Sequence, residues 1–129
     1  LVTLLGLLNF SSPAQAEFVH NYSGWKELPQ SQRDGYAMGL LDGMLLRNGK
    51  DINEDLSFYF GLNQCGVDLN LTNKMMAEAI TKYYEQHTTS WGKPPSHAFT
   101  RAIVRGACLD HLNASRKKYG LSELTKLSE

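Results

Sequence analysis

The sequence predicts an all-α fold, a small helical bundle stapled by one disulfide bond. Apolar side chains recur at helical spacing in several long segments, and the one short alternating stretch has no second strand-like segment to pair with. The chain holds two cysteines, Cys65 and Cys108, and it starts with an export signal. Its 129 residues correspond to one domain, so we expect residues 17–129 to form a single helical domain.

Residues 1–16 are predicted to be a cleaved signal peptide. They read LVTLLGLLNFSSPAQA, carry no charge, and end in the Ala14-Gln15-Ala16 pattern of a cleavage site. The apolar run is far shorter than the roughly 20 residues that span a bilayer, so we expect no membrane insertion after cleavage. A basic leader and an initiator Met are missing, which indicates a sequence truncated at its start or one that begins at a non-standard start codon. The alternative is a buried N-terminal helix.

The composition excludes several classes of function. The 13 Lys and Arg balance the 13 Asp and Glu, and no basic block is present, so we expect no nucleic-acid partner. The four histidines show neither H-E-x-x-H spacing nor a C-x-x-C pair, which predicts no metal site and no cofactor. Asp51, Asn53 and Asp55 resemble the start of a calcium loop. However, Leu56 and Leu62 occupy its diagnostic Gly and Glu positions.

Cys65 and Cys108 are predicted to form a disulfide bond. An exported chain works in an oxidising compartment, where two cysteines most simply pair. In the chain-entropy model the bridge contributes about 4 kcal/mol to the free energy of unfolding. A free reactive thiol and an intermolecular bridge are the alternatives. No serine lies in a G-x-S-x-G elbow, so we predict no catalytic residues and no enzymatic activity.

The first long helix is predicted to begin at Pro29 or at Ser31 and to run to Arg47, where Asn48-Gly49 ends it. Upstream, an apolar cluster is expected to pack on this helix as a short turn. The cluster comprises Phe18, Tyr22, Trp25 and Leu28. The apolar face of the helix carries Tyr36, Leu40, Leu41, Met44 and Leu45.

Gly35, Gly39 and Gly43 form a stripe on this helix at i+4 spacing. Each exposed glycine would cost the helix about 1 kcal/mol relative to alanine, so a close approach of another backbone should offset the cost. We expect tight packing on another helix of the same domain, and the alternative is a dimer or partner contact on that face. Asp42 lies at the edge of the apolar face, where a buried carboxylate needs a polar partner. We assign it a structural role rather than a catalytic one.

The segment 50–71 shows no helical period. Leu56, Phe58 and Phe60 alternate along it, which permits a short strand, an extended segment or a short helical turn. The next helix is predicted to follow Thr72 as its N-cap. Its apolar stripe consists of Met76, Ile80, Tyr83 and Tyr84.

A second loop, residues 87–96, contains the candidate partner-binding residues. Pro94 and Pro95 stiffen it, and Trp91 and Lys93 stand among polar residues. A large aromatic side chain on a stiff loop is either tucked under the loop or offered to a partner.

The third long helix is predicted to run from Ser96 to Lys118. Arg101 and Arg105 are expected on its solvent side, and Ser122 is expected to cap a short final helix. The predicted buried side comprises Phe99, Ala102, Ile103, Gly106, Ala107 and Leu112, with Cys108 beside it.

Several of these motifs occur in an order that is typical of one protein family. The helix that contains Tyr36-Ala37-Met38-Gly39-Leu40-Leu41-Asp42-Gly43 follows an export signal, and Cys65 then precedes a helix that ends in Tyr83-Tyr84-Glu85-Gln86-His87. Pro94-Pro95 precedes a helix in which Cys108 closes the pattern. From Trp25 to Cys108 this layout resembles the small periplasmic immunity proteins that protect bacteria from type VI secretion amidases.

The resemblance implies an all-helical periplasmic protein, a homodimer, that blocks the active-site cleft of a secreted peptidoglycan amidase. The mechanism would be steric occlusion, without chemistry of its own. The best candidates for the contact are Trp91, Lys93, Pro94 and Pro95. The polar faces of the flanking helices come second. Three other functions stay open: a periplasmic helical chaperone or adaptor, an enzyme that uses Asp42 or Cys108, and a structural subunit of an envelope complex.

Overall fold

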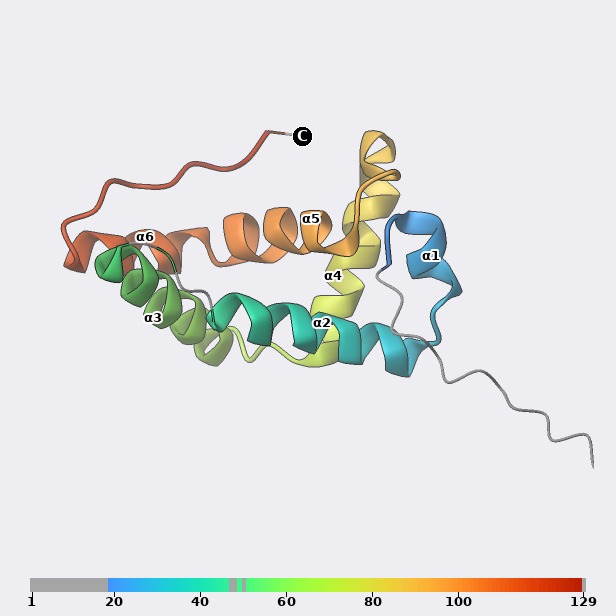
Figure 1. The fold of residues 1–129 in the computed structure, drawn as a ribbon, viewed down its shortest axis with the longest axis horizontal. Coiled ribbons are helices and arrows are strands. Elements are labelled where there is room, and N and C mark those ends of the chain that lie inside the picture. Colours follow the sequence, from blue (N-terminus) through green and yellow to red (C-terminus); the bar gives the residue numbers. More distant parts are fainter. Residues whose placement is uncertain (1–18, 47–48, 50, 129) are drawn as a thin grey trace, which may run out of the picture.

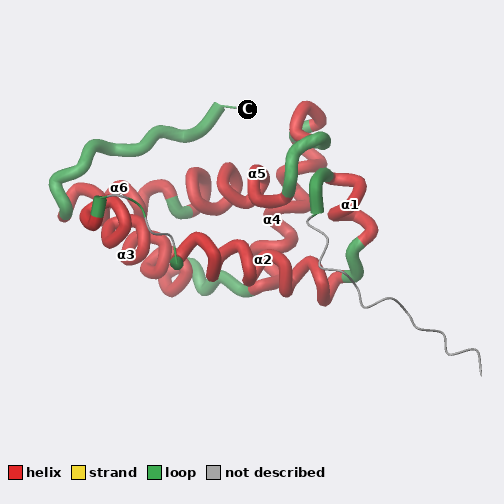
Figure 2. Tube along the Cα trace, in the orientation of Figure 1, coloured by secondary structure: helices red, strands yellow, loops and turns green. Residues whose placement is uncertain are grey.

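The computed structural model of the chain describes residues 19–46, 49 and 51–128. This part is all-helical and contains no strand, as predicted (Figure 1; Figure 2). The predicted signal peptide and Phe18 lie outside the described residues. The elements are α1 (Tyr22–Glu27), α2 (Gln30–Leu45), α3 (Ile52–Asp68), α4 (Asn73–Gln86), the short 3-10 helix η1 (Thr88–Ser90), α5 (Pro95–Phe99), the π-helix η2 (Thr100–Ala107) and α6 (Leu109–Lys118).

The helices form two long layers that are joined at both ends. In Figure 1, α2 lies along one side, and the run from α5 through η2 to α6 lies along the other. At one end α4 packs on both α2 and α5, and at the other end α3 packs on α6. None of the helices in the described part is long and apolar enough to cross a membrane.

Helix α1 confirms the cluster predicted before the first long helix. Asn21 caps it by accepting a hydrogen bond from the N–H of Gly24 at 2.9 Å. Trp25 is fully buried and donates through Nε1 to Thr81 Oγ1 at 2.9 Å. Its ring meets the ring of Tyr36 edge to face, with centroids 5.8 Å apart. These contacts fasten α1 to α2 and α4.

Helix α2 begins after Pro29, one of the two predicted starts. Gly35, Gly39 and Gly43 are exposed along it, and a Cβ built on any of them would meet nothing within 4 Å. The predicted packing of this stripe on another helix of the same domain is therefore wrong, while a dimer or partner contact stays a prediction. Asp42 is exposed as well, so it lacks the burial that would have required a polar partner.

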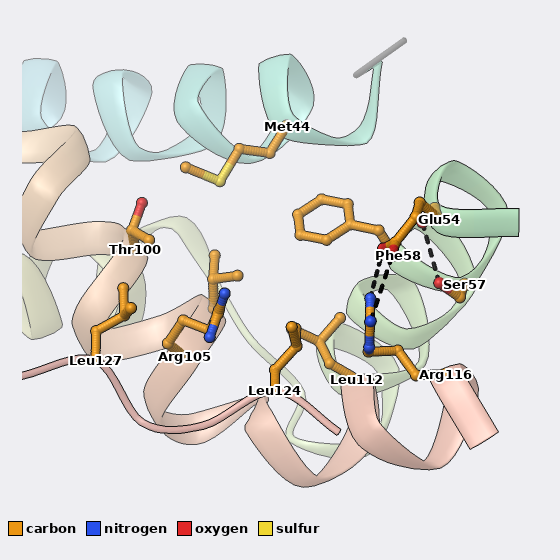
Figure 3. A pocket seen from close by; sticks show the side chains of 11 residues that line it. Met44, Glu54, Ser57, Phe58, Thr100, Arg105, Leu112, Arg116, Leu124 and Leu127 are labelled. Carbon is orange, nitrogen blue, oxygen red and sulfur yellow. Dashed lines mark hydrogen bonds and ion pairs between the residues drawn. The ribbon is translucent and has the colours of Figure 1, made fainter. Parts of the chain in front are cut away.

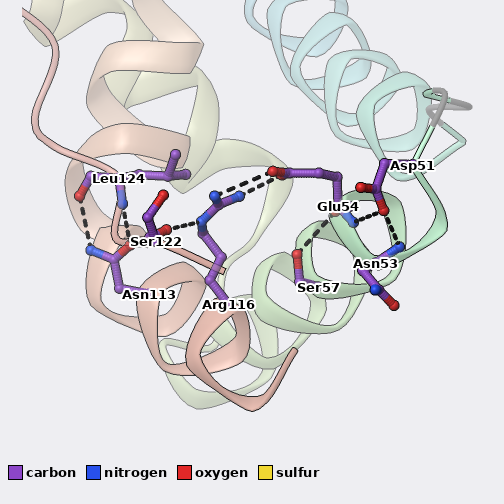
Figure 4. Close-up of polar contacts among 8 residues, drawn as sticks. All are labelled: Asp51, Asn53, Glu54, Ser57, Asn113, Arg116, Ser122 and Leu124. Atoms are coloured by element: carbon purple, nitrogen blue, oxygen red, sulfur yellow. Dashed lines mark hydrogen bonds and ion pairs between the residues drawn. The ribbon is translucent and has the colours of Figure 1, made fainter. Parts of the chain in front are cut away.

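Helix α3 is the largest departure from the sequence prediction, because it occupies most of the segment 50–71. Asp51 caps it by accepting hydrogen bonds from the N–H groups of Asn53 at 2.8 Å and Glu54 at 3.4 Å (Figure 4). The calcium-like spacing is thus a helix start. Small residues on the buried face erase the hydrophobic period on which the prediction relied. That face consists of Ser57, Gly61, Leu62 and Cys65.

Helix α4 confirms the second predicted helix. Thr72 is its N-cap, and Thr72 Oγ1 accepts a hydrogen bond from the N–H of Met75 at 3.1 Å. The whole predicted apolar stripe is buried, and it consists of Met76, Ile80, Tyr83 and Tyr84.

The third predicted helix is present, but it starts earlier and changes its pitch. Helix α5 has Pro95 in its first turn, so Ser96 is not the N-cap. From Thr100 to Ala107 the helix is of the π type, and the N–H of Cys108 donates to Ile103 O at 2.8 Å.

Gly106 permits this wider turn. A Cβ at that position would approach Arg101 O to 2.6 Å. The wider turn moves the buried side of the helix, so that Ile103, Cys108 and Leu112 are buried together. Ala107, which was predicted to be buried, is exposed for the same reason.

Helix α3 packs on α6 more extensively than any other pair of the described helices. Gly61 allows this approach, because a Cβ there would lie only 3.0 Å from Leu112 Cα and Ser115 Cβ. The predicted disulfide joins Cys65 of α3 to Cys108 at the start of α6. The two Cα atoms are 5.5 Å apart, and both residues are fully buried.

Residues 121–128, which we call the tail, are extended, so the predicted final helix after Ser122 is wrong. The tail runs back alongside α6 and η2 (Figure 1). Backbone groups of the tail form hydrogen bonds with side chains of those helices. Arg101 and Arg105, predicted on the solvent side, are half-buried and donate to tail carbonyls.

Reducing the disulfide is expected to lower the free energy of unfolding by about 4 kcal/mol, because the bridge restricts the unfolded chain. Denaturant titration with and without reductant measures this difference. Thiol titration of the unfolded, unreduced protein should detect no thiol, since Cys65 and Cys108 are paired. Two free thiols would contradict the bridge.

The substitution Gly61→Ala is expected to destabilise the protein by about 1–3 kcal/mol, because the added methyl group would force α3 away from α6. Gly39→Ala is the matched control. A Cβ there meets open space, and alanine favours the helix by about 1 kcal/mol over glycine. Equilibrium denaturation of both variants measures the difference, and a stability at Gly61→Ala equal to that of the wild type would contradict the close contact.

Candidate functional site

The loop between α4 and α5, residues 87–94, carries most of the predicted partner-binding residues on a rigid support. Tyr84 of α4 donates through its hydroxyl to Lys93 O at 2.6 Å. Trp91 donates through Nε1 to Tyr84 O at 2.8 Å, so one residue of α4 holds two positions of the loop. From α1, the N–H of Tyr22 donates to Trp91 O at 2.9 Å. We call this segment the α4–α5 loop.

Aromatic rings reinforce the support. The ring of Tyr22 stacks on Tyr84 with centroids 4.8 Å apart, and it lies 5.7 Å from the ring of Trp91. The ammonium of Lys26 lies 5.2 Å from the centroid of Tyr22. Burial, with a smaller contribution from Tyr36, raises the pKa of Tyr84. The hydroxyl therefore stays protonated and keeps donating to the loop.

Trp91 combines the two alternatives that the sequence left open. Its indole N–H is bound to the protein, yet 49% of its surface is exposed. Lys93 and Pro94 are exposed next to it, whereas Pro95 is buried and belongs to the support. A cavity of about 710 Å³ opens between the loop and α1, and it is lined by Asn21, Tyr22, Ser23, Lys26, Glu27, Trp91 and Gly92.

His97 of α5 anchors the loop from the other side. Its Nε2 lies 3.2 Å from Ser90 Oγ, and its Nδ1 lies 3.0 Å from a guanidinium nitrogen of Arg101. Because a guanidinium only donates, Nδ1 accepts and Nε2 carries the proton of the neutral ring. Burial and, secondarily, the positive charges of Arg101 and Lys93 lower the pKa of His97. The ring is thus held in the neutral form that fits both contacts.

A second exposed surface lies on α3. Large apolar side chains recur along its solvent face, and sequence analysis missed them because it assigned no helix to this segment. We call this surface the α3 apolar row. Contiguous exposed apolar side chains are typical of contact surfaces. The row consists of Ile52, Leu56, Tyr59, Phe60 and Val67.

Several groups that could take part in chemistry make structural contacts in the described residues. Among these residues, no group of three or more His, Cys, Asp or Glu is placed to hold a metal ion. The sulfur of Cys108 is bonded to that of Cys65. His111 Nε2 lies 3.0 Å from Asp68 Oδ2, which links α6 to α3.

Comparison of the chain with family models, with curated proteins and with solved structures found no match. The resemblance to immunity proteins consequently stays a prediction from sequence. Trp91, Lys93, Pro94 and Pro95 likewise stay predicted as partner-binding residues.

Acidification is expected to destabilise the folded protein through His97. Its pKa in the folded state lies below the ordinary value of 6.5, so below that pH the unfolded chain binds more protons than the folded one. The stabilising contribution is complete above the unfolded pKa and is lost as the pH falls toward the folded pKa.

Denaturant titrations between about pH 7 and pH 5 test this expectation. His97→Gln should flatten the dependence of the unfolding free energy on pH. His20→Gln is the control, because His20 is exposed. An equal slope in the wild type and His97→Gln would contradict the assignment.

Proposed function

We propose that the protein is a periplasmic immunity protein that binds and occludes a peptidoglycan amidase delivered by type VI secretion. The observation that carries this proposal is the rigid α4–α5 loop, which presents Trp91 beside the exposed Lys93 and Pro94. The order of motifs in the sequence supplies the class of partner. The disulfide is compatible with an exported protein.

Occlusion requires a loop that keeps its shape when it enters a cleft. Ordering a flexible loop on binding costs about 0.5–1.5 kcal/mol for each immobilised side chain. Here the hydrogen bonds of Tyr84 and Tyr22 order the loop during folding, before a partner arrives. Tryptophan is also one of the residues that most often dominate the free energy of an interface. A rigid loop with a half-exposed Trp91 therefore suits steric inhibition.

The proposal includes a homodimer. Gly35, Gly39 and Gly43 leave three positions on the exposed side of α2 without side chains, so a second backbone could approach the helix there. None of the described residues packs against these three glycines.

The α3 apolar row favours a second candidate function, a periplasmic adaptor or chaperone without enzymatic activity. Its members include Ile52 and Val67, which are 70% and 65% exposed. A protein that holds several clients would use such a surface instead of a single loop.

Co-expression in the periplasm with candidate amidases tests the proposed function. The wild-type chain should protect the cell and form a stable complex on a sizing column. Trp91→Ala is expected to weaken binding about 30-fold or more, a loss of about 2 kcal/mol, because it removes the central side chain of the contact. Phe60→Ala is the matched control, since its ring is also 49% exposed but lies on α3.

Loss of protection with Trp91→Ala and full protection with Phe60→Ala would support occlusion by the loop. The reverse result would move the function to the α3 apolar row and favour the adaptor. If the wild-type chain protects against none of the amidases and forms no complex, the immunity function is wrong.

A further inference from the structure

Asn113 of α6 binds the backbone of the tail. Its side-chain N–H donates to Leu124 O at 3.0 Å, and its side-chain oxygen accepts from the N–H of Leu124 at 2.7 Å (Figure 4). The amide thus satisfies both main-chain groups of one residue, as a neighbouring strand would. Such a contact holds an extended segment without regard to its side chains.

Three arginines of η2 and α6 also bind the backbone of the tail. Each donates to a main-chain carbonyl of the tail, which every residue type offers. The contacts are Arg116 Nε to Ser122 O at 2.6 Å, Arg105 to Thr125 O at 2.8 Å and Arg101 Nε to Ser128 O at 3.4 Å. The groove is therefore built to bind a peptide backbone.

Arg116 is oriented independently of the tail. It is only 7% exposed, and two of its nitrogens reach the carboxylate of Glu54 on α3 at 2.5 and 3.3 Å (Figure 4). The remaining nitrogen, Nε, is the one that donates to the tail. The donor is thus in place before any occupant arrives.

Leu124 and Leu127 give the tail its apolar contacts, but they do not fill the groove. Both line a cavity of about 490 Å³ that α2, α3, η2 and α6 enclose (Figure 3). Leu127 also lines a second cavity of about 340 Å³. Cavities of this size accept larger apolar groups than a leucine. The walls of the first cavity include Met44, Phe58, Thr100, Val104 and Leu112.

The tail is attached in a way that permits it to leave. It follows Gly120, which has φ +71° and around which a Cβ would meet nothing within 4 Å. Between and beside the two half-buried leucines, the side chains of Glu123, Thr125 and Lys126 are exposed. A segment with so few buried contacts opens at low free-energy cost.

We infer that this groove is a peptide-binding site, which the tail occupies in the free protein and from which an extended segment of a partner protein displaces it. The partner segment carries two large apolar side chains three residues apart, in the positions of Leu124 and Leu127. Its backbone is held by Asn113, Arg105 and Arg116. The inference does not depend on amidase occlusion, because the groove and the α4–α5 loop use different residues for contact.

A fluorescein-labelled peptide with the sequence of residues 121–128, LSELTKLS, is the probe for this site. Binding is measured by fluorescence anisotropy to the full chain and to a full chain with Leu124→Ser and Leu127→Ser, which releases the tail. The released-tail variant should bind the peptide at least tenfold more tightly than the wild type. Glu123→Gln with Lys126→Gln is the matched control on exposed positions of the tail, and it should behave as the wild type.

Two further changes test the proposed contacts. A peptide with phenylalanine in both leucine positions should bind more tightly than LSELTKLS, because the cavities have room. Adding Asn113→Ala to the released-tail variant should weaken binding at least tenfold. Circular dichroism and thermal melting establish that each variant is folded.

Several results would overturn the inference. One is equal binding of the peptide to the wild type and to the folded released-tail variant, and another is unchanged binding after both leucines of the peptide are replaced by serine. A wild-type dimer that the leucine substitutions convert to a monomer would assign the groove to the tail of a second copy. As an independent test on the wild type, excess phenylalanine peptide should speed hydrogen exchange at the Leu124 amide, and no change at saturation would also overturn it.

Discussion

The contact between α3 and α6 at Gly61 is the constraint on which the rest of the structure depends. Because Gly61 has no side chain, the two helix backbones approach so closely that a Cβ there would lie only 3.0 Å from Leu112 Cα. With the helices at this separation, the α-carbons of Cys65 and Cys108 lie 5.5 Å apart, which is within the range for a disulfide bond. The same approach places Glu54 against Arg116. The close contact at Gly61, the disulfide and the ion pair thus all join α3 to α6.

The ion pair between Glu54 and Arg116 orients the arginine side chain more than it stabilises the fold. Arg116 is buried, while the side chain of Glu54 is 47% exposed, so the attraction between the charges is partly screened by water. An unpaired buried guanidinium would nevertheless be costly, and the carboxylate together with Ser122 O satisfies its donors. The packing of α3 on α6 thus fixes an arginine that also binds the tail. In this way the core determines where the groove lies.

Features that follow from a local sequence pattern could be predicted. Features that depend on which element packs against a helix could not. Helix α4 has a full apolar stripe and an N-cap, and it was predicted with its buried residues. Helix α3 was missed because its buried face uses Ser57 and Gly61, whose fit depends on α6. The π-helix depends on the absence of a side chain at Gly106, where a Cβ would collide with Arg101 O. A single position of this kind leaves no periodic pattern in the sequence. At the candidate site the prolines indicated a stiff loop around Trp91. The support from Tyr22, whose N–H donates to Trp91 O, arises only when elements distant in sequence meet.

The α4–α5 loop and the groove meet in one residue, Arg101. One of its nitrogens donates to Nδ1 of His97, which anchors the loop, and its Nε donates to Ser128 O in the tail. Its positive charge is also one cause of the lowered pKa of His97. The support of the α4–α5 loop and the binding of the tail therefore share a single side chain on η2.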